Sequence, residues 1–89
     1  MNAMRRKRLY AARARLEDLS NGLRYICEEL REVRDDEQDA YDNLPDSIQE
    51  SSKGETMQEA IDKLEEILDE LEDIDLEKHL DEIEEVACI

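Results

Sequence analysis

The stretch "YDNLPDSIQESSKGETMQEAI", residues 41–61, interrupts an otherwise regular pattern of apolar and charged residues. It holds the only proline, Pro45, one of the two glycines, Gly54, and three of the four serines. A proline clashes with the preceding helical turn and pushes the residue before it out of the helical region. We therefore expect a turn over about residues 44–55, with a helix on each side of it.

The residues before this turn carry an apolar heptad pattern. Apolar side chains recur at alternating steps of three and four residues, with Glu37 as the one interruption: Leu9, Ala12, Leu16, Leu19, Leu23, Ile26, Leu30, Val33, Ala40 and Leu44. This spacing is typical of a helix that packs along a seam. The pattern passes Asn21–Gly22 without a change of phase, so we expect one helix over about residues 4–43.

A second helix is expected after the turn, over about residues 56–73. Its start has two candidate capping boxes, Thr56 with Glu59 and Ser52 with Glu55, so the helix begins near residue 52 or 56. Gly54 suits the left-handed conformation that often joins helices. The apolar stripe of this helix consists of Met57, Ala60, Ile61, Leu64, Ile67, Leu68, Leu71 and Ile74.

The apolar pattern changes phase after "EDID", residues 72–75. Leu76, Leu80, Ile83 and Ala87 form a stripe that is rotated by about 120° from the preceding one. A break near Asp73–Asp75, with an aspartate that caps a short third helix over about residues 76–87, is favoured. The alternative is a continuous helix whose last turns face a different surface.

These elements predict an all-α fold, with residues 1–89 as a single helical domain. The two long stripes indicate an antiparallel helical hairpin. With 89 residues, 39% hydrophobic and without Phe or Trp, the chain has little core of its own. We expect a homodimer that forms a four-helix bundle, with a monomeric three-helix bundle as the alternative. The predicted core or oligomer residues are Leu16, Leu19, Leu23, Ile26, Leu30, Val33, Leu64, Leu68 and Leu71.

Charge is divided unequally along the chain, whose net charge is −15. Residues 1–34 hold nine basic residues against five acids, whereas residues 35–89 hold three lysines against twenty-two acids. The second helix concentrates acids opposite its apolar stripe, with only Lys63 among them, and these are the predicted partner-binding residues: Glu59, Asp62, Glu66, Asp69, Glu70 and Asp73.

Two interpretations of this acidic surface remain open. It either keeps the bundle soluble and neutralises the basic first helix, or it occupies a basic groove built for nucleic acid. The second interpretation rests on charge density, since a dimer that doubled the density of one helix would approach that of a duplex. The second interpretation predicts a protein partner with a basic surface. Direct nucleic-acid binding by the whole chain is not expected at this net charge. The basic run Arg5–Arg8 is interpreted as a frayed, solvated tail or as a segment that pairs with the acidic C-terminus. Contact of this run with nucleic acid or an acidic membrane is the less favoured alternative.

The sequence favours a binding protein over an enzyme. His79 is the one histidine and has no companion ligands, so no metal or other cofactor is expected. Residues 35–46, "DDEQDAYDNLPD", alternate acids like a calcium loop but lack the glycine that such a loop needs. Cys27 and Cys88 do not make a disulfide framework. No membrane span is predicted, and the cytoplasm is the expected compartment.

Residues 40–72, "AYDNLPDSIQESSKGETMQEAIDKLEEILDELE", resemble a turn-plus-helix signature of small, mostly uncharacterised helical proteins. Prophages and mobile elements of Gram-positive bacteria encode these proteins. Here Lys53–Gly54 stands where that group often has Arg–Gly. The resemblance implies a phage or mobile-element context in a bacterial host and no particular activity. Together with the acidic second helix, this context favours a phage-type accessory protein that inhibits a basic nucleic-acid-handling or host-defence protein. The alternative is a structural protein that assembles helical bundles.

The turn itself has two interpretations. We expect it to serve as a connection between the helices. An exposed Leu44 or Ile48 would instead favour a docking epitope, because an apolar side chain exposed on a rigid turn marks a contact surface.

Overall fold

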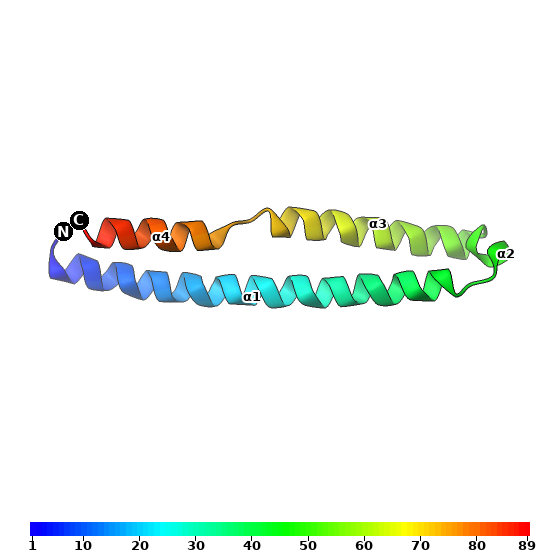
Figure 1. Ribbon diagram of the computed structural model, residues 1–89, viewed down its shortest axis with the longest axis horizontal. Helices are drawn as coiled ribbons and strands as arrows, with labels where there is room; N and C mark the ends of the chain where they lie inside the picture. The colour runs from blue at the N-terminus through cyan, green and yellow to red at the C-terminus, as the bar shows by residue number, and fades with distance from the viewer. The chain divides into compact units, whose positions relative to one another are not determined.

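A computed structural model describes all residues from 1 to 89 and is all-helical (Figure 1). It contains four helices: α1 (Ala3–Asp42), α2 (Asp46–Gln49), α3 (Ser52–Glu72) and α4 (Leu76–Ala87). The all-α class is confirmed. The first helix passes Asn21–Gly22 without a break, and a separate helix follows the interruption after α3, both as predicted.

The chain divides into two units, and α1 contributes to both. The first unit comprises Met1–Tyr25 and Ile74–Ile89, and the second comprises Ile26–Asp73. Each unit pairs a part of α1 with a later helix, which agrees with hairpin-like pairing inside the unit. A single domain and a dimeric bundle remain predictions.

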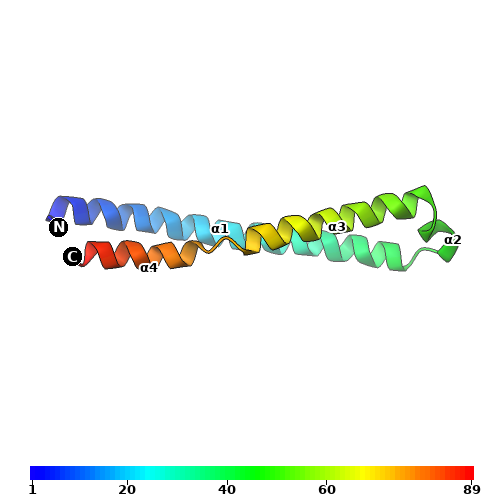
Figure 2. The same ribbon diagram turned by 90° about the horizontal axis from the view of Figure 1, so that it is seen from above.

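In the first unit, α4 lies antiparallel beside the beginning of α1 (Figures 1 and 2). Leu80 and Ala87 of α4 are buried. The Nε of Arg6 donates to the carbonyl oxygen of Ala87 at 2.6 Å, and the Nε of Arg13 donates to that of Leu80 at 3.2 Å. Long arginine stems therefore cover part of this seam while their charged ends reach backbone acceptors.

Asp75 caps the start of α4. Its carboxylate accepts a hydrogen bond from the backbone N–H of Lys78 at 3.1 Å, which satisfies one of the free donors of the first turn. The sequence had indicated an aspartate in this role, and the structure confirms it.

The change Asp75→Ala is expected to lower the free energy of unfolding by about 1 kcal/mol, because the Lys78 N–H loses its acceptor. Urea unfolding followed by helical circular dichroism measures this change. Asp73→Ala is the matched control, since it removes the same group where the carboxylate caps no helix N-terminus, and it should alter stability by about 0.5 kcal/mol or less. Equal effects of the two substitutions would contradict the capping role.

In the second unit, the remaining part of α1, the short α2 and α3 form a helical hairpin (Figure 2). Pro45 precedes α2, where its lack of an N–H is tolerated. The side-chain amide of Gln49 donates to the carbonyl oxygen of Tyr41 at 2.9 Å and ties α2 to the end of α1. Ile61 and Leu68 form the most deeply buried part of α3, and Cys27 is buried on α1.

The expected left-handed conformation of Gly54 is wrong. No glycine has a positive φ, and Gly54 lies buried in the first turn of α3. A Cβ at this position would stand 1.9 Å from the carbonyl oxygen of Gln49. Gly54 is therefore required by the close approach of α2 to α3, and its backbone conformation is ordinary.

Both predicted capping boxes are also wrong. The N-cap of α3 is Ser51, whose side chain makes no capping hydrogen bond, and the hydroxyl of Thr56 donates to the carbonyl oxygen of Ser52 at 2.9 Å inside the helix. The helix begins earlier than a Thr56 cap requires because α2 leads into it through residues 50 and 51.

The core prediction is correct for one set of α1 residues and wrong for another. Leu16, Leu23 and Leu30 are partly buried, as are Leu64 and Leu71 of α3. In contrast, Leu19, Ile26 and Val33 are 61%, 53% and 47% exposed. The seam side of α1 instead continues through small or polar residues at the intervening positions: Arg13, Ser20, Cys27 and Arg34. As oligomer contacts, Leu19, Ile26 and Val33 remain a prediction.

Candidate functional site

Six carboxylates lie on the outer side of α3, and we call them the acidic face: Glu59, Asp62, Glu66, Asp69, Glu70 and Asp73, the last at the C-cap. All six are exposed. Their spacing places them away from the buried Ile61 and Leu68 on the same helix. The sequence pattern had already grouped these residues, because helical periodicity is a local property.

The acidic face is poorly compensated. Asp62 accepts a hydrogen bond from the Gln58 amide at 2.9 Å, and Glu66 forms an ion pair with Lys63 at 3.4 Å. No other ion pair involves these six residues. Carboxylates four residues apart, such as Glu66 and Glu70, repel each other by a few tenths of a kcal/mol, roughly. A face kept for stability alone would mix the two signs of charge.

Four arginines of α1 form ion pairs, and their partners all lie outside the acidic face. In the first unit, Arg13 contacts Glu84 at 3.3 Å and Arg24 contacts Glu77 at 2.7 Å. Such exposed pairs each contribute about 0–1 kcal/mol. The interpretation that the two halves neutralise each other therefore holds for the residues next to the seam.

In the second unit, Arg31 forms an ion pair with Glu72. The hydrogen bond to the Glu72 carboxylate raises the pKa of the Arg31 guanidinium above its usual value. The guanidinium of Arg34 forms an ion pair with the carboxylate of its neighbour Asp35, at 2.9 Å. None of these arginines reaches the acidic face, so that face keeps its charge.

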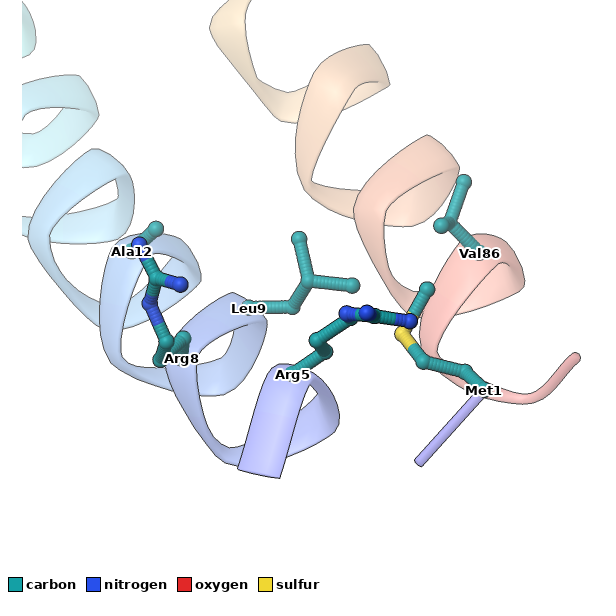
Figure 3. Close-up of a pocket in the computed structure, with 6 residues that line it drawn as sticks. All are labelled: Met1, Arg5, Arg8, Leu9, Ala12 and Val86. Carbon is teal, nitrogen blue, oxygen red and sulfur yellow. The ribbon is translucent and has the colours of Figure 1, made fainter. Parts of the chain in front are cut away.

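The first unit carries a shallow apolar hollow of about 420 Å³ (Figure 3). It is lined by Met1, Arg5, Arg8, Leu9, Ala12 and Val86. The side chain of Leu9 points between α1 and α4, Arg5 extends from α1 toward Met1, and Arg8 runs along α1 toward Ala12.

The basic run Arg5–Arg8 is helical and not frayed. Three of its side chains are exposed, and Arg6 contacts the C-terminal end of the chain. The run lies inside α1, which begins at Ala3, and Arg6 is bonded to Ala87. Residues 5, 8, 9 and 12 share one face of a helix, so the sequence contained a signal for the hollow. The missing information was that α4 lies beside this face and contributes Val86.

Few other side chains are of a type that could act in catalysis or bind a metal ion. His79 is exposed, with its Nδ1 3.5 Å from the Glu82 carboxylate. No three His, Cys, Asp or Glu side chains converge where they could hold a metal ion. Asp35, Glu37 and Asp39 lie in the regular helix α1, so they form no calcium loop. Cys27 is buried and Cys88 is exposed, and both are free thiols.

The turn presents one apolar side chain. Leu44 is partly buried, whereas Ile48 of α2 is 37% exposed. Ile48 therefore meets the condition that we set for a docking epitope, and Leu44 does not. One side chain gives a small area for a contact surface, and the six exposed side chains of the acidic face give a larger one.

No helix combines the length and the apolar character that crossing a bilayer requires. No known protein-family model, curated protein or solved structure matches this chain.

Proposed function

We propose that this protein acts by protein–protein contact and that the acidic face of α3 binds a basic surface of a nucleic-acid-handling protein. The observation that carries this proposal is the lack of compensation at the face. Three arginines of α1 pair with Glu72, Glu77 and Glu84, and five of the six outer carboxylates have no cation partner. An opposing basic surface would remove their mutual repulsion.

The charge density of the face fits such a partner. Residues 59–73 hold eight acids and one lysine. At 1.5 Å per residue they span roughly 22 Å, which gives about one net negative charge per 3 Å. Duplex DNA carries about one charge per 1.7 Å of its axis. The face of one copy therefore carries about half the linear charge density of duplex DNA, with the same sign of charge, so a groove built for nucleic acid is a suitable receptor.

The biological setting is a further part of this proposal and rests on the resemblance of residues 40–72 to prophage and mobile-element proteins. In that setting the protein is a non-enzymatic accessory factor, free of cofactors, in the cytoplasm of a bacterial host. It inhibits a basic host-defence or nucleic-acid-handling protein by occupying its nucleic-acid site.

The test is a charge reversal on the acidic face, with Glu66, Asp69, Glu70 and Asp73 all changed to Lys. The matched control reverses four exposed acids on the outer side of α1, namely Glu28, Glu32, Asp39 and Asp42, and gives the same net charge. Both variants should keep the helical circular dichroism of the parent. Only the acidic-face variant should lose capture of basic proteins from bacterial lysate, by about tenfold or more.

Two conditions sharpen this experiment. Capture by the parent protein should disappear as salt rises from about 0.1 M to about 1 M, because charge-driven docking is screened. A short DNA duplex should release the captured protein, since it competes for the same groove. Capture that persists unchanged at high salt, or equally in both variants, contradicts the proposal.

A second candidate function is the assembly of helical bundles. The exposure of Leu19, Ile26 and Val33 favours it, because such apolar side chains at heptad spacing are typical of a helix contact. Under this candidate, polar substitutions at Leu23 and Leu64 break the assembly, and charge reversal on the acidic face changes little.

A further inference from the structure

We propose that two copies of this chain pack against each other through one face of α1, with their α1 helices antiparallel and the two-fold axis near Gly22. The face consists of apolar residues seven positions apart, which we call the α1 ridge: Ala12, Leu19, Ile26, Val33 and Ala40. All five are exposed. Residues at this spacing share one side of a helix.

In the second unit, the pair formed by α1 and α3 has an apolar side and a charged side, and the ridge lies on the apolar side. Ile26 directly precedes the buried Cys27, and on α3 Ala60 and Ile67 directly precede the buried Ile61 and Leu68. In an antiparallel pair, residues that hold this position on both helices lie on the same side of the seam. This side is therefore apolar on both helices.

The opposite side of the same unit is charged and already paired. Arg31 directly follows the partly buried Leu30, Glu72 directly follows the partly buried Leu71, and the two form an ion pair. The unit thus holds an ion pair between its helices on the charged side and leaves its apolar side open. An open apolar side of this kind is stabilised by a further helix.

The charged residues beside the α1 ridge are arranged in an order that favours an antiparallel second copy as the partner. A neighbouring row of residues seven positions apart holds Arg8, Arg15, Gly22, Glu29 and Asp36, and the last four of these lie three positions after the ridge residues Ala12, Leu19, Ile26 and Val33. None of these four charged side chains takes part in an ion pair within the chain. The order is two positive charges, a glycine and two negative charges. A second copy that runs in the opposite direction therefore places its negative charges opposite these positive ones.

An antiparallel second copy therefore matches four of the five ridge residues and the flanking charged residues. With the axis near Gly22, Leu19 lies opposite Ile26 of the second copy, and Ala12 lies opposite its Val33. In the same register Arg15 meets Glu29 of the second copy, and Arg8 meets its Asp36. A parallel arrangement would instead place Arg15 against Arg15 and Glu29 against Glu29, which is repulsive.

The ridge lies on α1 and the acidic face lies on α3, so this proposal does not depend on the proposed partner of the acidic face. It gives a specific register to the expected four-helix bundle. The charge reversal on α3 described above should leave the dimer intact.

Sedimentation equilibrium over a range of concentrations tests the contact. The parent protein should dimerise, and Leu19→Asp should weaken the dimer by about tenfold or more, because the contact would bury an unpaired carboxylate. Tyr25→Asp is the matched control, since Tyr25 is exposed on α1 but lies off the ridge, and it should leave the dimer unchanged. A monomeric parent protein overturns the proposal.

A charge exchange tests the register and does not depend on an apolar substitution. Arg15→Glu and Glu29→Arg should each weaken the dimer, and the double variant should recover it, because the two residues meet across the axis. Failure of the double variant to recover contradicts the antiparallel register.

A cysteine at the axis tests the position of the centre. A Cβ at Gly22 meets no atom within 4 Å, so Gly22→Cys fits the single chain. In a Cys88→Ser background it should form an intermolecular disulfide, which requires Cα atoms within about 7 Å. Tyr25→Cys in the same background should not. Cross-linking at residue 25 in preference to residue 22 would move the contact to another face and overturn the proposal.

Discussion

Replacing Gly54 with alanine is expected to lower the free energy of unfolding by about 3 kcal/mol. Alanine normally stabilises a helix relative to glycine by about 1 kcal/mol, so the expected sign is the reverse of the usual one. The reason is steric. The added Cβ would lie 1.9 Å from the carbonyl oxygen and 2.5 Å from the carbonyl carbon of Gln49, and backbone atoms cannot rotate away as a side chain can.

Gly22→Ala is the matched control for this substitution. Gly22 also lies inside a helix, but a Cβ there meets nothing within 4 Å, so the change should raise the free energy of unfolding by about 1 kcal/mol. Urea unfolding of both variants at low protein concentration gives the two values. Stabilisation by both substitutions would show that α2 does not dock against α3 as described.

The second large effect is expected at Ile61. This side chain is 1% exposed, and Ile61→Ala should lower the free energy of unfolding by about 3 kcal/mol, because it removes buried methylene and methyl groups and leaves a cavity. Ile74→Ala removes the same atoms from a side chain that is 48% exposed and should cost about 1 kcal/mol or less.

Chemical unfolding measured by circular dichroism distinguishes the two isoleucines. A similar loss of stability at both positions would mean that Ile61 is not the centre of the second unit. The result also bears on function, because Ile61 and Leu68 hold α3 in place and so orient the carboxylates on its outer side. Binding through the acidic face should fall in Ile61→Ala only where the variant is partly unfolded.

The acidic face was predictable from the sequence, whereas its lack of compensation was not. Helical spacing alone places Glu66, Asp69 and Asp73 opposite the apolar stripe. Which acids meet the arginines of α1 depends on the distances between side chains of different helices. The structure pairs Arg24 with Glu77 and Arg31 with Glu72, so the outer carboxylates are left without these cations.

The sequence by itself determined the helices, the position of the turn, the break before α4 and the division of charge. These features follow from local causes: heptad periodicity, the proline at residue 45 and an aspartate able to cap at residue 75. Such causes act within a few residues, so they can be recognised without knowledge of distant parts of the chain.

Only the tertiary structure decided which side of α1 forms the seam and why Gly54 is a glycine. The heptads of α1 are compatible with two overlapping apolar sides, and the chosen one includes Arg13, Ser20 and Cys27 while Leu19 and Ile26 stay exposed. Arginine stems can pack against a neighbouring helix as apolar residues do, so the pattern alone does not select the side. The requirement for Gly54 arises from the docking of α2, a contact that exists only once the chain has folded.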